Sequence, residues 1–369
     1  MILRRRERVT NDFRIAVMAG DGIGQEVTPA ALAVADAALA ATGGVRLARE
    51  DAPAGAAHYQ ATGAAFPEAS RAVCDSADAI YLGAMGLPSV RYADGTEIAP
   101  QLDLRFMYNL YAGVRPTRAI PGVKGTLADP RAAEIDFVIV RESTEGLFHS
   151  RGKGTVEDDE TARETLQITR RVSERVFDFA FREAERRRAE GRPGRLTLID
   201  KANVFTAFAF FRKVFDEVAR RHPDVTADHL YVDAAALTMV AQPWRLDVTV
   251  TENMFGDILS DLAAGLVGGM GYAPSADIGD DRAVFQPAHG SAPDIAGTGK
   301  ANPVAAILSA AMMLDWLGTR HGEPSAVEAG RRIGRAVDAA FAEGALVTCE
   351  LGGSAGTRAV TDAVLAALA

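Results

Sequence analysis

The sequence contains few of the residues that disulfide frameworks and cysteine-based metal centres require. Cys74 and Cys349 are the only cysteines among 369 residues, too few for a disulfide scaffold or for a thiolate site holding zinc or an iron–sulfur cluster. The sequence also lacks an apolar run of the roughly 18 residues that a membrane helix needs. These absences argue against a disulfide-stapled protein and against an integral membrane protein.

Basic residues are outnumbered by acidic ones. The chain has 40 Lys and Arg against 49 Asp and Glu, which gives a formal net charge of −9. Because nucleic acids and anionic membranes are bound by basic surfaces, we predict neither as a partner, although a local arginine cluster could hold a small anion. The basic residues 1–8 precede no apolar stretch and no cleavage site. We therefore predict a solvated tail, no secretory signal and a cytoplasmic location.

Apolar segments and a glycine turn near the start predict an α/β protein. Residues 13–18 form an apolar run that is typical of a buried strand, and a turn and an Ala-rich helix pattern follow. Further strands are predicted at 79–82, 111–116, 136–141, 195–200 and 246–251. Helices are predicted at 25–41, 68–75, 161–188, 204–220, 255–267, 303–317, 325–341 and 357–368.

The distribution of glycine-rich and chemically active segments predicts two domains. The glycine-rich segments lie near both ends of the chain, and the candidate catalytic residues lie mostly between them. We predict a large discontinuous domain of residues 1–110 and 268–369, with a smaller domain of residues 111–267 inserted. The polar, acidic segment Gly152–Thr161 is expected to form an exposed arm. The mixed-charge run 182–190 is expected to be a solvated helix face.

The turn Gly20-Asp21-Gly22-Ile23-Gly24 resembles a dinucleotide-binding fingerprint. In that fingerprint, glycines let the backbone approach a pyrophosphate at a helix N-terminus. The spacing here is G-x-G-x-G instead of G-x-G-x-x-G, and a purely structural turn explains it equally well. We therefore predict an α/β fold that is not a true Rossmann fold.

Asp257 and Asp261 lie four residues apart in a predicted helix, so they share one face. Two carboxylates stacked in this way repel each other, unless a hard cation such as Mg²⁺ or Mn²⁺ lies between them. The alternative is one acid favoured by the helix dipole and one solvated acid. Small and apolar neighbours favour a position that faces the interior or a cleft, and therefore a metal site.

Three arginines are placed where a carboxylate ligand could bind. Arg105 and Arg115 lie in apolar surroundings, and Arg141 ends an apolar strand. Ligands of α/β proteins bind at strand ends, and the guanidinium fork suits a carboxylate, so the set suggests a di- or tricarboxylate. Lys201 follows the predicted strand 195–200 and could act as an acid or base, although a solvated lysine is the simpler alternative.

The loop that begins at His289 is a candidate cofactor site. It is rich in Gly, Ser and Pro and leads to the predicted helix at Pro303. It can present backbone N–H groups together with His289 and Asp294. An aspartate suits ribose hydroxyls and would repel a 2′-phosphate, which favours NAD over NADP. A structural role for His289 is the alternative.

Together these segments are similar to the isocitrate/isopropylmalate dehydrogenase family of metal-dependent, decarboxylating 2-hydroxyacid dehydrogenases. The resemblance covers nearly the whole chain. It rests on the segments 20–24, 105, 115, 141–146, 200–203, 233–234, 256–261, 289–303, 351–353 and 357. It implies an isopropylmalate dehydrogenase-like fold and a homodimer with shared active sites, or a tetramer made of two such dimers.

The resemblance also implies roles for individual residues. Asp257 and Asp261 would bind Mg²⁺ or Mn²⁺ together with Asp233 of the neighbouring subunit, and Lys201 would cross the interface as the catalytic base, with Asp233 beside it. The substrate-binding residues would be Arg105, Arg115, Arg141, Gln101 and Leu102. The NAD-binding residues would be His289, Gly290, Ser291, Ala292, Asp294 and Asn302. NADP-dependent members have Lys and Tyr where this chain has Asp294-Ile295, which favours NAD.

Two departures from the family pattern leave the reaction and the substrate open. Family members have a Tyr seven residues after the third arginine, whereas this chain has Phe148. Either His149, Tyr108 or water replaces that proton donor, or the enzyme oxidises a hydroxy-diacid without decarboxylation. A non-catalytic regulatory subunit is a further alternative, although Lys201 and the metal-binding acids are retained. With Ile98, Gln101 and Leu102 in the substrate pocket, D-malate, tartrate, 3-isopropylmalate or another 3-substituted (R)-malate fits.

Overall fold

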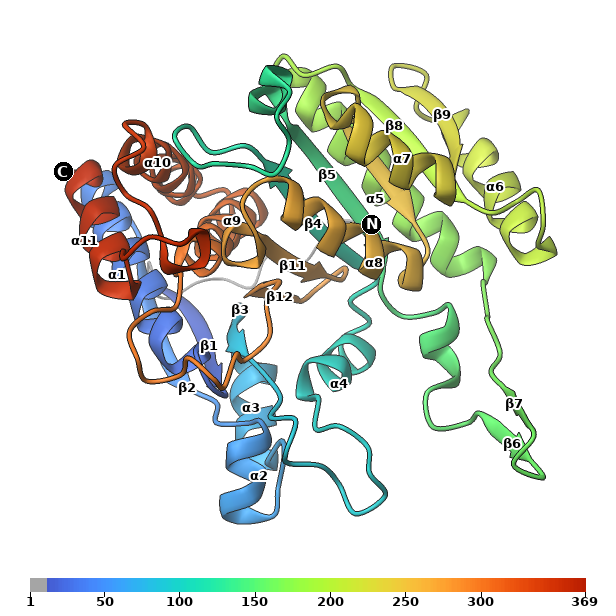
Figure 1. The fold of residues 1–369 in the computed structure, drawn as a ribbon, viewed down its shortest axis with the longest axis horizontal. Coiled ribbons are helices and arrows are strands. Elements are labelled where there is room, and N and C mark those ends of the chain that lie inside the picture. The colour runs from blue at the N-terminus through green and yellow to red at the C-terminus, as the bar shows by residue number, and fades with distance from the viewer. Residues whose placement is uncertain (1–11) are drawn as a thin grey trace.

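A ten-stranded sheet extends across the molecule (Figure 1). The computed structural model describes residues 12–369, so the predicted solvated tail lies outside the described residues. In spatial order the strands are β2 (Arg46–Asp51), β1 (Asp12–Gly20), β3 (Ala79–Ala84), β12 (Ala283–Pro287), β11 (Pro274–Ile278), β4 (Ala112–Arg118), β5 (Asp136–Glu142), β10 (Val248–Thr251), β8 (Arg195–Asp200) and β9 (Thr226–Tyr231).

The three central strand pairs are antiparallel and the outer pairs are parallel. β11 pairs antiparallel with both β12 and β4, and β4 pairs antiparallel with β5. The flanking strands, such as β5 and β10, are continuous buried runs of β-branched residues, as expected for parallel strands covered on both faces. This strand order confirms an α/β protein that is not a Rossmann fold.

Helices from the two ends of the chain cover the half of the sheet that contains β1, β3 and β12. α1 (Gly24–Thr42) packs against α9 (Val304–His321), α10 (Pro324–Phe341) and α11 (Thr357–Leu368). Beside the other half lie α5 (Arg170–Ala189), α6 (Thr206–Ala219), α7 (Val232–Ala241) and α8 (Asn253–Leu266) (Figure 1). The first and last parts of the chain therefore lie together, as the sequence suggests, whereas the boundaries of the two predicted domains stay a prediction.

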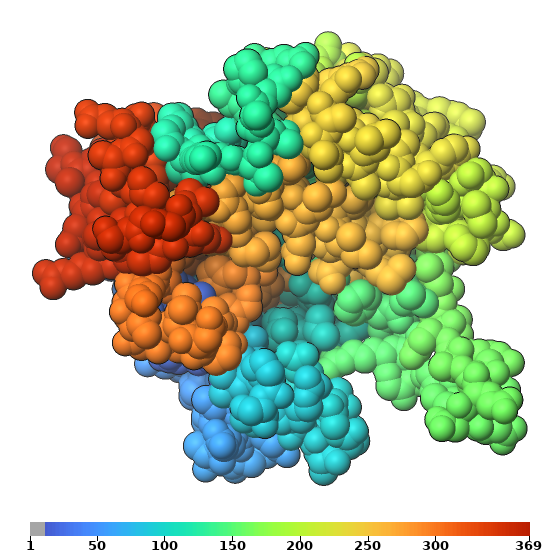
Figure 2. Space-filling model, in the orientation of Figure 1, coloured from blue at the N-terminus to red at the C-terminus, as the bar shows by residue number. Residues whose placement is uncertain are grey.

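All six predicted strands are present, but the predicted helix 161–188 is wrong at its start. Thr161–Arg163 is strand β7, which pairs with β6 (Thr155–Glu157), and α5 begins only at Arg170. Thr169 caps that helix, because its Oγ1 accepts a hydrogen bond from Val172 N at 3.4 Å. The arm predicted at Gly152–Thr161 is exposed and projects from the body of the molecule (Figure 2).

The expectation of a fully solvated run at 182–190 is wrong for Arg187. Its side chain is buried and donates from Nε to Asp247 Oδ1 at 2.6 Å and from Nη1 to Asp136 Oδ1 at 3.0 Å. Arg186 beside it is half-exposed and pairs with acids of its own helix. α5 lies on the sheet, so one residue per turn of the charged run points inward.

The remaining elements connect these layers. α2 (Ala56–Thr62), α3 (Glu68–Ser76) and α4 (Pro100–Met107) follow β2 and β3, and short 3₁₀ turns occur at Pro130–Glu134, Leu147–Ser150, Pro243–Arg245, Met270–Tyr272 and Cys349–Leu351. Within residues 12–369, no helix combines the length and the apolar character that crossing a lipid bilayer demands.

The glycine turn after β1 is a structural junction. The buried carboxylate of Asp21 accepts hydrogen bonds from the backbone N–H groups of Ala56, Ala57 and Gly86 at 2.8–2.9 Å. Gly22 has φ +53°, and a Cβ added there would lie 2.0 Å from the carbonyl oxygen of Ser291. Ile23 N donates to that same oxygen at 2.8 Å. The turn therefore holds the loop that begins at His289.

Candidate active site

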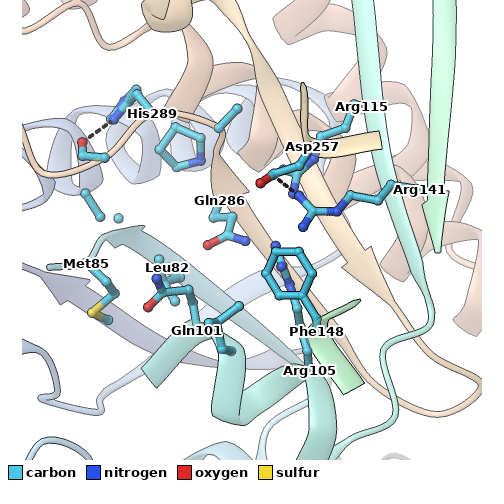
Figure 3. A pocket seen from close by; sticks show the side chains of 16 residues that line it. Leu82, Met85, Gln101, Arg105, Arg115, Arg141, Phe148, Asp257, Gln286 and His289 are labelled. Atoms are coloured by element: carbon cyan, nitrogen blue, oxygen red, sulfur yellow. Dashed lines mark hydrogen bonds and ion pairs between the residues drawn. The ribbon is translucent and has the colours of Figure 1, made fainter. Parts of the chain in front are cut away.

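A polar cavity of about 230 Å³ lies where the central strands meet α4 and α8 (Figure 3). Arg105 comes from α4, Arg115 from β4 and Arg141 from the end of β5. The cavity is lined by Leu82, Gly83, Ala84, Met85, Gln101, Leu102, Arg105, Arg115, Arg141, Phe148, Asp257, Gln286, Pro287, Ala288, His289 and Gly290. The fold thus brings together the predicted arginines, the predicted pocket residues and the start of the predicted cofactor loop.

All three arginines are buried, and Arg115 has an unsatisfied donor. Its Nε is buried without a hydrogen-bond partner, and its nearest acid is Asp277, 3.8 Å away. Burial lowers the pKa of Arg115, and burial also lowers the pKa of Arg141 to about 10. Buried cations are costly unless they are paired and hydrogen-bonded. The arrangement is therefore suited to binding an anion in the cavity.

Arg141 is held by the start of α8. Its Nε and Nη2 donate to Asn253 Oδ1 at 2.9 and 2.7 Å, and its Nη1 donates to Asp257. α8 begins at Asn253 because the Glu252 carboxylate caps it, accepting from the backbone N–H groups of Met254 and Phe255. The cap therefore sets the direction from which Asp257 reaches the cavity.

Asp277 lies behind the arginines, and the sequence analysis missed it. Its carboxylate is 1% exposed and accepts from Arg105 Nε at 3.0 Å and from Gln286 Nε2 at 2.9 Å. Burial by itself would raise the pKa of Asp277, but the charges of the three arginines outweigh it and hold the pKa below its ordinary value. An acid inside the apolar run 274–278 was the available signal, and β11 was not among the predicted strands.

The two acids of α8 occupy different positions. Asp257 lines the cavity with its side chain 53% exposed, whereas Asp261 is exposed and lies outside the lining. Asp257 therefore faces the cavity, whereas a cleft position for Asp261 stays a prediction. Burial raises the pKa of Asp261, and the charge of Asp257 adds to this. Two oxygen-ligand side chains one turn apart fit a hard divalent cation.

Lys201 and Asp233 lie next to each other but away from the cavity of their own chain. Lys201 Nζ donates to Asp233 Oδ1 at 2.6 Å, and neither residue lines the cavity. In the part of the chain that is described, no three His, Cys, Asp or Glu side chains gather as metal ligands. A single chain thus does not bring Asp233 to the acids of α8, and the shared metal site stays a prediction.

The predicted substrate pocket is present at one side of the arginines. Gln101, Leu102 and Phe148 line both the polar cavity and an adjoining cavity of about 420 Å³. The Phe148 ring centroid is 5.3 Å from Arg141 Cζ, and Figure 3 shows the ring facing the arginines. Gln101 Oε1 is buried without a hydrogen-bond partner. Ile98 is buried in a separate cluster and does not line either cavity.

Neither side chain suggested as a replacement proton donor reaches the polar cavity. Tyr108 donates its hydroxyl hydrogen bond to Asp75 Oδ1 at 2.7 Å, and His149 lies 3.4 Å from Gln167 through Nδ1. Neither Tyr108 nor His149 is among the lining residues. Of the three candidates, water is therefore the one that the geometry leaves.

The predicted cofactor loop begins at the cavity and runs away from it. His289 and Gly290 line the cavity; burial lowers the pKa of His289, and its Nε2 has no hydrogen-bond partner. Ser291 Oγ donates to Gly86 O, and Asp294 is exposed. The Asn302 side chain is less available to a cofactor, because its Nδ2 donates a hydrogen bond to Glu350 Oε2 at 3.1 Å. The loop thus offers backbone groups, an imidazole whose Nε2 has no partner while its Nδ1 bonds to Gly290 O at 2.9 Å, and an exposed carboxylate next to the anion-binding cavity.

Comparison with known proteins agrees with this geometry. A family model described as isocitrate/isopropylmalate dehydrogenase matches residues 14–364. A Methanocaldococcus jannaschii protein named 3-isopropylmalate/3-methylmalate dehydrogenase is 41% identical over 352 residues, covering 95% of this chain and 97% of that protein. A Corynebacterium kroppenstedtii 3-isopropylmalate dehydrogenase is 41% identical over 347 residues, covering 92% and 97%. The crystal structure of isocitrate dehydrogenase from Methylococcus capsulatus has a TM-score of 0.81 at 36% identity, covering 96% and 99%.

Proposed function

This chain belongs to the isocitrate/isopropylmalate dehydrogenase family and is an NAD-dependent, metal-dependent dehydrogenase; from that premise we propose that it oxidises and decarboxylates a 3-substituted (R)-malate. The observation that carries the substrate proposal is the buried arginine cluster. Arg115 keeps an unsatisfied Nε beside a cavity that Arg105 and Arg141 also line. Carboxylates of a malate would supply the missing acceptors.

We propose Mg²⁺ or Mn²⁺ as the metal and NAD as the nucleotide. Asp257 and Asp261 fit a hard cation because they offer carboxylate oxygens one helical turn apart. A bound ion would lower the pKa of the substrate hydroxyl and stabilise negative charge on its oxygen. The orphaned Nε2 of His289 and the exposed Asp294 fit a nucleotide that carries free ribose hydroxyls and accepts hydride.

The catalytic base is proposed to come from a second copy of the chain. Lys201 Nζ, in its neutral form, would take the hydroxyl proton of the substrate, and Asp233, 2.6 Å away, would stabilise the ammonium that results. Leu237 and Val240 of α7 and Ile258 of α8 are 68%, 49% and 61% exposed. Apolar side chains gathered on two packed helices mark an association surface, and Ile258 adjoins Asp257. We therefore propose a homodimer, or two dimers as a tetramer. The cytoplasmic location predicted from the sequence is part of the same proposal.

One observation favours oxidation without decarboxylation as a second candidate. Phe148 lines the cavity beside Arg141 and has no proton to donate to an enolate carbon. Oxidation needs a base, a metal site and a nucleotide site, whereas protonation after loss of CO₂ needs an acid. Phe148→Tyr should therefore raise the ratio of CO₂ to NADH if the second candidate holds, and should leave a ratio near one unchanged if water already serves.

The test is a parallel measurement of NADH and CO₂ with Mn²⁺ and NAD. The substrates are (R)-malate, tartrate, 3-isopropylmalate, isocitrate and homoisocitrate. We expect NADH with at least one of them and an equal amount of CO₂. NADH without CO₂ would establish the second candidate, and no NADH with any of them would refute the proposed substrate class.

Asp257→Asn tests the metal proposal. It removes a charged ligand with little change in shape, so metal-dependent turnover should be lost. Asp281→Asn is the matched control, because Asp281 is exposed and lines neither cavity. Full turnover by Asp257→Asn would show that the metal does not bind at α8.

A further inference from the structure

We infer that Asp277 is a positioning and specificity-determining residue that makes the arginine cluster select substrates with two carboxylates over substrates with three. The inference rests on the proposed function in one respect, namely that the cavity binds a malate-type anion. It concerns the charge of the cluster and not the chemistry of the reaction.

Asp277 is placed to hold two of the side chains that face the ligand. Its Oδ2 accepts from Arg105 Nε at 3.0 Å and from Gln286 Nε2 at 2.9 Å, and both donors belong to cavity-lining residues. Asp277 itself does not line the cavity and is 1% exposed. It therefore acts on a ligand through Arg105 and Gln286 and through its charge.

The carboxylate also reduces the positive charge that the cavity offers. Arg141 donates to Asp257 and Asn253, and Arg105 commits its Nε to Asp277. Of the three arginines, Arg115 is the one whose buried Nε has no hydrogen-bond partner among the described residues. Its closest acid is again Asp277, at 3.8 Å. Because Asp277 is fully buried, water and salt screen its charge weakly.

This degree of neutralisation fits a dianion better than a trianion. Asp277 has already neutralised part of the positive charge of the three arginines, so a third ligand carboxylate would add negative charge that the cluster compensates less well. A buried carboxylate costs desolvation energy, and its Oδ1 remains without a hydrogen bond. A neutral side chain could hold Arg105 without that cost, so the charge itself is the feature that needs a functional reason.

The experiment compares the binding of two ligands that do not require turnover. The full-length protein with Mg²⁺ is titrated calorimetrically at pH 8 and fixed ionic strength with (R)-malate, a dianion, and with tricarballylate, a trianion. Wild type should bind tricarballylate no more tightly than malate. Asp277→Asn, which keeps the shape and an acceptor oxygen, should shift the ratio of the two dissociation constants toward tricarballylate by tenfold or more.

Asp247→Asn is the matched control. Asp247 is also 1% exposed and also accepts from a buried arginine, Arg187, but it lies outside the cavity. It changes the net charge by the same amount, so any effect of total charge or of lost stability is common to both variants. The control should leave the ratio of dissociation constants unchanged.

The outcomes separate the inference from the proposed function. If Asp277→Asn weakens both ligands equally, or leaves the ratio unchanged, Asp277 is only structural and the inference is overturned. If the ratio shifts while no malate is oxidised, the inference holds and the proposed reaction fails. Asp277→Ser provides the same reading if the Asn variant does not fold. If neither variant folds, the ratio of the two dissociation constants of the wild-type protein decides. Tighter binding of tricarballylate than of malate by the wild type would contradict the inference.

Discussion

Arg115 shows how a single residue can carry evidence of a ligand. A guanidinium group has five N–H donors and stays charged at any physiological pH. β4 places it in the protein interior, where burial lowers its pKa and where Nε finds no acceptor. A side chain in this state is stabilised by whatever anion enters the cavity.

Arg115→Gln should therefore weaken substrate binding. A hydrogen bond to a charged group contributes about 1.5–3 kcal/mol, so we expect KM for the active malate to rise by roughly 10- to 150-fold. Arg118→Gln is the matched control, since Arg118 lies on the same strand, pairs with Asp338 and does not line the cavity. Steady-state kinetics of both variants check this, and equal effects would contradict a binding role for Arg115.

Glu142, the last residue of β5, should make stability depend on pH. Burial raises its pKa from 4.5 to about 7, although Thr144 and Glu145 donate hydrogen bonds to it. Because the folded pKa exceeds the unfolded one, its contribution is fully present below pH 4.5 and is lost as pH rises through 7. That shift corresponds to about 3 kcal/mol.

Glu142→Gln removes this titration. Urea unfolding between pH 5 and pH 8, at one protein concentration, should show wild type losing stability relative to the variant as pH rises. The variant has its own offset, because a Gln amide cannot accept from both Thr144 and Glu145 as a carboxylate does. The slope is the test, and parallel stability curves would show that Glu142 is charged throughout.

At the scale of elements, the turn after β1 connects the two ends of the chain. The turn supports the loop at His289 through Ser291 O, and Glu26 in the first turn of α1 accepts from Gly297 N and Gly299 N of the same loop. The proposed cofactor loop, which has no regular structure, is thus fixed from a helix start 271 residues earlier in the sequence.

Gly22→Ala should disturb that support. A left-handed conformation costs an L-residue about 1–2 kcal/mol, and the new Cβ would meet Ser291 O at 2.0 Å. We expect a lower melting temperature and a raised KM for NAD. Gly63→Ala is the control, because Gly63 also has positive φ but has nothing within 4 Å of the added Cβ. It should lose stability without a change in KM for NAD.

Neighbouring arginines of α5 illustrate how packing decides the value of an ion pair. Arg187→Met removes a buried cation from Asp247 and Asp136, and leaving such acids unpaired costs about 3–5 kcal/mol. Arg186→Met removes the pairs that the half-exposed Arg186 makes with Glu183 and Glu190, and pairs of a solvent-exposed arginine contribute about 0–1 kcal/mol. Denaturant unfolding of the two variants should show this difference, and similar losses would contradict the burial argument.

At the scale of the whole molecule, the residues of the proposed active site lie in two separate places on one chain. The cavity holds Asp257 and the arginines, whereas Lys201 and Asp233 lie outside it. The exposed apolar residues of α7 and α8, Leu237, Val240 and Ile258, lie on two packed helices that also carry Asp233 and Asp257. A dimer related by a two-fold axis would present each chain's lysine to the other chain's cavity.

Mixing two inactive variants tests this division. Lys201→Ala and Asp257→Asn should each be inactive, but dissociated and reassociated together they should recover about a quarter of wild-type activity, because half of the dimers are mixed and each has one intact site. Arg105→Ala combined with Asp257→Asn in one chain, mixed with Lys201→Ala, tests the same site from both sides. Arg115→Gln mixed with Asp257→Asn is the control and should show no activity beyond that of Arg115→Gln itself, since both residues belong to the same cavity. Absence of recovery in the first mixture would refute shared sites.

The sequence by itself determined six of the strands, the arginines and the two acids of α8, because buried apolar runs and the four-residue helical spacing are local properties of the chain. Only the tertiary structure decided that Arg187 is buried, that α5 begins at a cap provided by Thr169, and that Asp277 stands behind Arg105. Asp277 and Arg105 are 172 residues apart in sequence, one on β11 and the other on α4. No local pattern encodes such a neighbour, because strand order is fixed by packing of the complete chain.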